Sequence, residues 1–174
     1  VKRSAKGLNV NSDEIFIKVI TSVRTEGEIT TKELDKLVYE IAASYTGSHH
    51  DYSRLASSVA ISSYHKETNS SFSETMMMLY SDGIIHDKLI ETIKEYGEDT
   101  IDAVINHDND YNFDYFAWRS LQEMYLLKRP NGVTVERPQH MYMRIALWVT
   151  ESFVDAVEYY KSLSNQLISK ATPI

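Results

Sequence analysis

Residues 136–144 read Glu-Arg-Pro-Gln-His-Met-Tyr-Met-Arg, and the fold can be worked out from this stretch outward. Pro138 lacks a backbone N–H, so it suits the first turn of a helix, where that donor would have no partner inside the helix. The apolar residues that follow it continue at helical spacing. Ahead of the stretch, Asn131-Gly132 is the dipeptide that two-residue hairpin turns prefer. We therefore predict a helix that begins at Pro138, preceded by one short β-hairpin near residues 125–136.

The rest of the chain is patterned for helices. Apolar residues recur every three to four positions, as they do on the buried face of a helix. Thr30-x-x-Glu33 and Ser71-x-x-Glu74 have the pattern of a capping box, in which a hydroxyl and a carboxylate satisfy the first N–H groups of a helix. We predict an all-α fold, a multi-helix orthogonal bundle with the one hairpin. Its helices are expected at about 13–23, 31–45, 51–67, 86–96, 99–106, 114–127, 138–149 and 152–167, with one more that begins after Ser71.

Composition excludes several classes of protein. The 174 residues are 43% hydrophobic and 25% charged, which is ordinary for a globular domain and argues against disorder. The net charge is −7 and no run of basic residues exceeds two, so we expect no nucleic-acid surface. No apolar stretch approaches the roughly 20 residues that a membrane-spanning helix needs, and no signal peptide opens the chain. We expect no membrane partner and a cytoplasmic location.

Two features of the sequence suggest a metal site, a segment like a calcium-binding loop and the histidines, and neither has the residues that such a site needs. Residues 108–114 place side-chain oxygens as a calcium loop does, but Phe113 stands where that loop needs glycine and Arg119 where it needs a bidentate glutamate. A polar loop with a cap ahead of the helix at Phe116 is the better interpretation. The histidines do not share a helix face with metal-ligand spacing, and the chain contains no cysteine. We therefore expect no metal site. The six histidines are His49, His50, His65, His86, His107 and His140.

A family resemblance joins these elements. Residues 136–144 resemble the ERPQHM-x-MR segment of the large (α) chain of class I ribonucleotide reductase, and further stretches resemble other segments of that family in the same order. They are residues 30–35 (TT-x-ELD), 51–56 (DY-x-x-LA), 65–68 (HKET), 115–116 with 121–128 (YFGFKTLE-x-SYLLK), and 169–174 (HA[TS]PT or PTPI). Six matches in family order are a far more specific signal than any one of them.

The resemblance implies a domain plan and a function. Residues 1–69 would be the carboxy-terminal part of an ATP-cone regulatory domain, 70–168 the all-α amino-terminal domain, and 169–174 the start of the α/β barrel. The family reduces ribonucleoside diphosphates with a thiyl radical and a pair of thiols, and here no cysteine is present. We therefore expect an amino-terminal piece of the enzyme, inactive alone. It would work with the cysteine-bearing downstream portion and with a small subunit that supplies the radical. The alternative is a free-standing, non-catalytic module that binds nucleotide or a partner protein.

The resemblance also implies site residues. Thr31, Asp35 and Lys66 match positions of the cone that contact the effectors ATP and dATP, and Thr172 matches a residue that touches the diphosphate of the substrate. From the residues alone, the two threonines at 30–31 could merely cap a helix, Asp35 and Lys66 could be solvated surface charges, and Thr172 could be a residue without function. No cofactor is expected to reside in this chain. The family's cone opens with a basic hairpin that has no counterpart in these matches, so we expect ATP and dATP to bind weakly.

Overall fold

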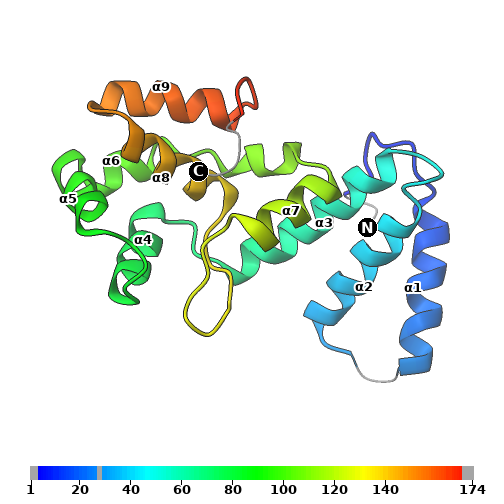
Figure 1. The fold of residues 1–174 in the computed structure, drawn as a ribbon. Helices are drawn as coiled ribbons and strands as arrows, with labels where there is room; N and C mark the ends of the chain where they lie inside the picture. Colours follow the sequence, from blue (N-terminus) through cyan, green and yellow to red (C-terminus); the bar gives the residue numbers. More distant parts are fainter. Residues whose placement is uncertain (1–3, 27–28, 170–174) are drawn as a thin grey trace. The chain divides into compact units, whose positions relative to one another are not determined.

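A computed structural model describes residues 4–26 and 29–169, and the chain divides into two compact units. The first unit comprises the residues up to Glu67 together with Tyr111–Leu121. The second comprises Thr68–Asp110 and the residues from Gln122 onward. Figure 1 shows helices throughout both units. The prediction of an all-α fold is confirmed, and the packing of the whole chain as one orthogonal bundle stays a prediction.

The first unit is built on three helices and part of a fourth. These are α1 (Ser12–Glu26), α2 (Thr31–Ser44), α3 (Asp51–Glu67) and the first part of α7 (Tyr115–Met124). Helix α2 packs against both α1 and α3. The apolar residues at helical spacing meet in one core, which contains Ile15, Val19, Val38, Ala42, Tyr52, Leu55, Ala56 and Val59. Removing this much apolar surface from water is the main force that holds the helices together.

The second unit has its own core. Its helices are α4 (Phe72–Ser81), α5 (Asp87–Tyr96), α6 (Glu98–Asp102), α8 (Pro138–Val149) and α9 (Phe153–Ser164), with the 3-10 turn η1 (His107–Asn112) at its border. Helices α8 and α9 lie side by side (Figure 1), and α5 packs on α8. The fully buried members of this core include Phe72, Met76, Leu79, Ile93, Ile101, Met143 and Ala156. Helix α6 is shorter than the helix predicted at residues 99–106, since it ends at Asp102.

The predicted caps form. The Thr30 hydroxyl accepts the Glu33 N–H at 3.2 Å, and the Glu33 carboxylate accepts the Thr30 N–H at 2.9 Å. The Thr30 hydroxyl also donates to the Glu33 carboxylate at 2.7 Å, and this bond, together with the one from the Thr30 N–H, holds the pKa of Glu33 below its usual range. Ser71 caps α4 by accepting the Glu74 N–H at 3.0 Å, but the Ser71 N–H donates to the Asn69 side chain at 2.9 Å, so only half of the predicted capping box forms. Asp114 caps α7 by accepting the Ala117 N–H at 2.8 Å. The interpretation of residues 108–114 as a polar loop with a cap is confirmed.

The predicted β-hairpin near residues 125–136 is wrong. Within the described residues the segment forms no strand, only a single antiparallel bridge between Lys128 and Thr134. The turn is closed by the Gly132 N–H, which donates to the Arg129 carbonyl at 2.8 Å, so Pro130 and Asn131 are its central residues. Proline fixes the φ angle that the first central position needs, and this moves the turn one residue back from Asn131-Gly132. Gly132 instead takes the left-handed conformation just after the turn, with φ of +82°.

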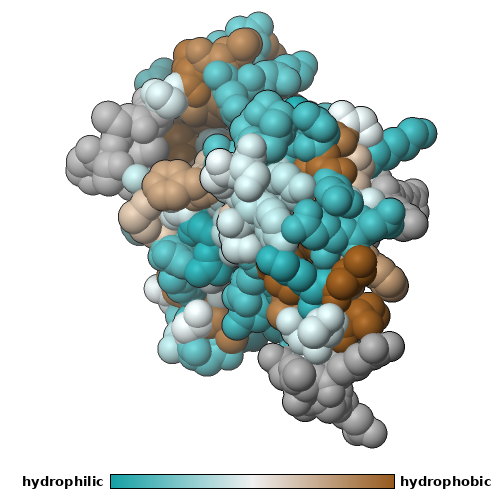
Figure 2. Space-filling model, turned by 90° about the vertical axis from the view of Figure 1, so that its right-hand side faces the viewer, coloured by the Kyte–Doolittle hydropathy of each residue, from teal (hydrophilic) through white to brown (hydrophobic). Residues whose placement is uncertain are grey.

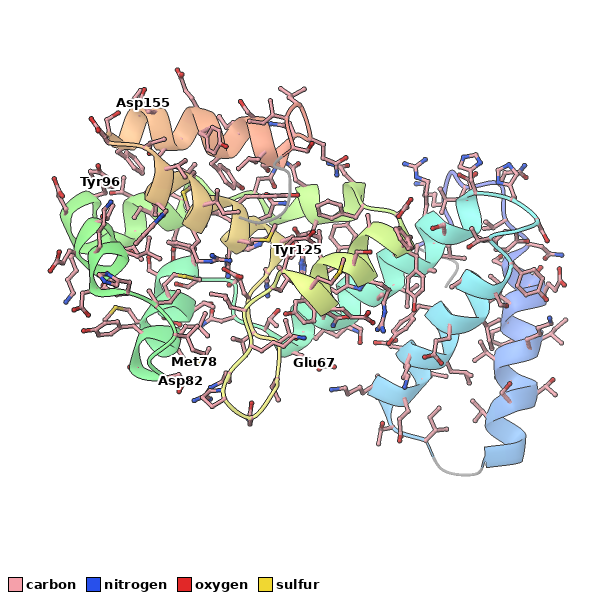
Figure 3. All side chains as sticks on the ribbon, in the orientation of Figure 1. Glu67, Met78, Asp82, Tyr96, Tyr125 and Asp155 are labelled. Atoms are coloured by element: carbon pink, nitrogen blue, oxygen red, sulfur yellow. The ribbon has the colours of Figure 1, made fainter. Side chains whose placement is uncertain are left out.

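A side-chain contact outside the segment holds this loop. The Arg129 guanidinium donates two hydrogen bonds to the carboxylate of Asp82, at 2.7 and 3.0 Å. Asp82 follows α4 and is labelled in Figure 3. The arginine holds the pKa of Asp82 below its usual range. The loop is thus positioned by a planar two-bond ion pair and not by a strand ladder.

One face of the molecule is mostly polar. Figure 2 shows one face on which hydrophilic residues predominate and hydrophobic residues form separate patches. Among the described residues, no helix combines the length and the apolar character that crossing a bilayer requires.

Candidate functional site

The structure brings together two of the three predicted effector residues. Asp35 lies in the second turn of α2 and Lys66 in the last turn of α3, and the Lys66 Nζ is 2.9 Å from the Asp35 Oδ2. Thr31 is the first residue of α2, one helical turn before Asp35 on the same side of the helix. The cap of α2 is made by Thr30 and Glu33, so the Thr31 side chain is not needed as a helix cap.

A second ion pair runs beside the first. The Lys32 Nζ lies 2.7 Å from the Glu67 Oε2, again between α2 and α3. Glu67, at the end of α3, is labelled in Figure 3. The side chains of Lys66 and Lys32 are 60% and 72% exposed, so both amines are open to an anion from solvent. Pairs this exposed add little to stability, on the order of 0 to 1 kcal/mol each. The surface where α2 meets α3 is therefore polar and accessible, with two lysines already balanced by two carboxylates.

Residues 136–144 build a buried polar network inside the second unit. The Glu136 side chain is fully buried, and its carboxylate accepts two hydrogen bonds from the Arg144 guanidinium, at 2.6 and 3.1 Å. It also accepts the backbone N–H of Leu127 at 2.9 Å. The pair thereby ties the start of α8 to the segment that precedes the Arg129 turn.

Gln139 forms a second branch of this network. Its amide nitrogen donates to the buried carboxylate of Asp110 at 3.0 Å. Its oxygen accepts from the hydroxyls of Tyr160 and Ser164 on α9, at 3.0 and 2.6 Å. The Tyr160 hydroxyl in turn accepts the backbone N–H of Asn106 at 2.9 Å. One amide therefore connects α8, α9 and the η1 turn.

Arg137 and His140 reach the segment just ahead of α4. The Arg137 guanidinium donates to the hydroxyl and the carbonyl of Thr68, at 2.9 and 2.6 Å. The Nε2 of His140 lies 3.3 Å from the carbonyl of Ser70, and the Nε2 of His107 is 2.8 Å from the same oxygen. Every polar side chain of residues 136–140 thus makes a hydrogen bond inside the protein. The role of the stretch is therefore structural.

Burial also affects the tyrosines of this region. It raises the pKa of Tyr142 to about 12, with the charge of Asp110 adding to the shift. Burial likewise raises the pKa of Tyr160, and this outweighs the opposing effect of the Asn106 N–H and of Ser164. Both phenols therefore keep their protons at neutral pH.

A groove of about 270 Å³ opens on the second unit between α5 and α8. Trp148 lines it and is 48% exposed, with the Lys88 Nζ 4.9 Å from the centre of its ring. Met141 and Ile145, which precede Trp148 on α8, are 5% and 6% exposed. The accessible apolar surface of α8 is thus confined to its carboxy-terminal end.

The remaining candidate residues are Thr172 and the histidines that precede α3. Thr172 lies outside the described residues. Within them, the donor atoms of His49, His50 and Asp51 lie within 4.8 Å of one another, at the turn that leads into α3. Ligand spacing on one helix face does not reveal this cluster, because its two imidazoles and one carboxylate are adjacent in a turn.

Comparison with known proteins gives one consistent result. Residues 111–174 match the family described as ribonucleotide reductase, all-alpha domain. The chain is 36% identical to the ribonucleoside-diphosphate reductase large subunit of Variola virus, an alignment that covers 99% of this chain and 24% of the relative. The subunits of the same name from Danio rerio and Arabidopsis thaliana are 34% and 37% identical, over 99% and 83% of this chain and 23% and 19% of their own.

The chain thus spans about a fifth to a quarter of the length of the curated relatives it matches. The all-alpha match takes in residues 136–144, whose side chains make a buried polar network in the second unit. The chain is therefore similar, over almost its whole length, to part of the large subunit of ribonucleoside-diphosphate reductase, and its residues 111–174 match that family's all-alpha domain.

Proposed function

We propose that this chain is the amino-terminal regulatory and helical portion of a ribonucleoside-diphosphate reductase large chain. The complete enzyme would reduce ribonucleoside diphosphates to deoxyribonucleoside diphosphates for DNA synthesis in the cytoplasm. The observation that carries the proposal is similarity to large subunits over 99% of the chain, joined to the all-alpha match at residues 111–174. Within such an enzyme, the polar network around residues 136–144 would hold the helical portion rigid beside the catalytic part.

The chemistry itself must be carried elsewhere. A thiyl radical and a reducing thiol pair need cysteine, and the chain has none. We propose that the cysteine-bearing downstream portion of the large chain supplies the thiols and that a small subunit generates the radical. The ribonucleoside diphosphate would bind mainly to the downstream portion.

A reconstitution tests this proposal. The chain alone, mixed with small subunit, ribonucleoside diphosphate, effector and dithiol, is expected to form no deoxyribonucleotide. Fused ahead of the cysteine-bearing portion of a relative's large subunit, it should restore turnover. Deoxyribonucleotide formation by the chain alone would overturn the assignment of chemistry. A folded fusion that stays inactive, while the relative's intact large subunit is active, would overturn the assignment of the chain to this enzyme.

We further propose that residues 1–69 derive from an ATP-cone, residues 70–168 form the all-α domain, and residues 169–174 lead into the barrel. In this scheme Thr31, Asp35 and Lys66 are the contribution of the chain to an effector site for ATP or dATP. The 60% exposure of Lys66 supports access of a phosphate, while the ion pair with Asp35 offsets much of its charge.

The isolated chain is expected to bind ATP and dATP weakly. A phosphate must compete with the Asp35 carboxylate for Lys66, and one lysine with one hydroxyl is a small part of a triphosphate site. Calorimetric titration of the chain measures this affinity, and Lys94→Ala, which removes an exposed lysine from α5, serves as a matched control for Lys66→Ala. Micromolar binding that Lys66→Ala abolishes would contradict the expectation and would favour a free-standing nucleotide-binding module.

Thr172→Val is expected to raise the KM for the ribonucleoside diphosphate roughly tenfold in the fused enzyme. We propose that the Thr172 hydroxyl donates to the diphosphate, and a hydrogen bond to a charged group contributes about 1.5 to 3 kcal/mol. Valine keeps the shape and removes the donor, so kcat and folding should change little. Steady-state kinetics of the two fusions decide the matter, and an unchanged KM would withdraw the substrate role.

A further inference from the structure

Three adjacent residues at the turn before α3 bring together ligand atoms of a kind that transition metals prefer. The donor atoms of His49, His50 and Asp51 lie within 4.8 Å of one another. Neutral imidazole nitrogen suits zinc, copper and nickel, whereas magnesium and calcium prefer all-oxygen sites. The chemistry of this cluster therefore differs from that of a common acidic surface patch.

The spacing of the donors is close to that of a coordinated ion. The His50 Nε2 lies 3.2 Å from the Asp51 Oδ1, and the His49 Nδ1 lies 3.7 Å from the Asp51 Oδ2. Ligand atoms about 2.0 to 2.2 Å from a tetrahedral zinc ion are about 3.4 Å from each other. The cluster needs only small side-chain adjustments to surround one ion.

The carboxylate of the cluster is held in place by a neighbouring segment. The backbone N–H of Asn9 donates to the Asp51 Oδ2 at 2.7 Å, and this bond keeps the pKa of Asp51 below its usual range. The Asp51 side chain is only 11% exposed, while that of His50 is 76% exposed. One ligand is thus fixed and ionised, and the other opens the site to solvent, from which an ion can enter.

The two imidazoles can share one cation. Their ring centres are 4.5 Å apart, and their donor nitrogens lie within 4.8 Å of each other, so one ion can reach a nitrogen of each ring. The side-chain amide nitrogen of Asn9 lies 3.4 Å from the His49 Nε2. This contact helps to orient the His49 ring, whose Nδ1 lies 3.7 Å from the Asp51 carboxylate.

Two contacts oppose metal binding and set its strength. The Asp51 N–H lies 3.2 Å from the His49 Nδ1, so a metal must displace that hydrogen bond. Arg54, one turn further along α3, adds a positive charge near the carboxylate. Both contacts weaken metal binding. They therefore favour a site that exchanges its ion and keeps one coordination position for water, and they disfavour a closed structural site.

We propose that His49, His50 and Asp51 bind one zinc ion, with water as the fourth ligand. The ion would attach the beginning of α3 to the segment that contains Asn9, because Asp51 holds both. Zinc would then stabilise the first unit by binding the folded chain more tightly than the unfolded chain.

Titration of the intact chain with Zn²⁺ in a calorimeter tests the proposal directly. One ion should bind per chain, and His49→Ala and His50→Ala should each weaken binding at least tenfold, since loss of even an outer-shell partner costs roughly 10- to 100-fold. The matched control is His86→Asn, which removes another exposed histidine but keeps an acceptor for its cap on α5. It should bind zinc as the unmodified chain does.

Thermal unfolding gives a second readout. At a free Zn²⁺ concentration about 100 times the dissociation constant, the unfolding midpoint should rise by roughly 5 °C or more, and His50→Ala should reduce the rise to about half or less. His50 is the sharper variant because Asp51 also binds Asn9, so loss of Asp51 disturbs the fold itself. The proposal would be overturned if the chain bound no zinc in a millimolar excess of the ion. It would also be overturned if His49→Ala and His50→Ala both bound zinc as tightly as the unmodified chain.

Discussion

Glu136→Ala is expected to lower the free energy of unfolding of the second unit by about 3 to 5 kcal/mol. The Glu136 carboxylate is fully buried and accepts from Arg144 and from the Leu127 N–H. Alanine would leave the Arg144 guanidinium, which is only 24% exposed, without its carboxylate, and the Leu127 N–H without its acceptor. Breaking one partner of a buried pair is costly because the remaining charge stays out of water.

Urea unfolding measures this loss, with the fluorescence of Trp148 as the probe of the second unit. The chain has two tryptophans, so Trp118→Phe leaves Trp148 as the single reporter in every variant. Glu158→Ala is the matched control, because Glu158 is exposed on α9 and the same change there should stay within about 0.5 kcal/mol. A loss below about 1 kcal/mol for Glu136→Ala would mean that the buried pair contributes little to the native state.

Much of the secondary structure could be predicted from sequence because its causes are local. A cap such as that of Thr30 and Glu33 involves residues three apart, and an apolar stripe needs only the residues of one helix. The turn near Asn131 was mispredicted for a reason that the sequence does contain. Pro130 determines which residues are central in the turn, and its fixed φ angle outweighs the preference of the Asn-Gly pair.

The partners inside the second unit could not be predicted in the same way. Gln139 bonds to Asp110, which is 29 residues away in the sequence, and Arg129 bonds to Asp82, which is 47 away. Nothing local to either residue indicates its partner, because the fold brings them together. The same holds in the first unit, where the ion pair of Lys66 with Asp35 joins two helices and makes the predicted effector residues neighbours.

The expected cost of Gln139→Leu is about 3 kcal/mol in the same unfolding experiment. Leucine has a similar volume but cannot donate to the Asp110 carboxylate or accept from the hydroxyls of Tyr160 and Ser164. Each buried polar group that loses a partner costs about 1 to 3 kcal/mol, and burial of the leucine side chain offsets part of the sum.

A double-mutant cycle with Tyr160→Phe separates the shared network from simple loss of packing. Tyr160→Phe alone removes one donor to Gln139 and the acceptor of the Asn106 N–H, and it should cost about 1 to 3 kcal/mol, although Ser164 still donates to the Gln139 oxygen. In the Gln139→Leu background the hydroxyl has already lost its acceptor and keeps only the bond from the Asn106 N–H, so removing it should cost less. The two changes should therefore be non-additive by about 0.5 kcal/mol or more. Strict additivity would show that Gln139 and Tyr160 stabilise the unit independently, and that the hydrogen bond between α8 and α9 contributes nothing of its own.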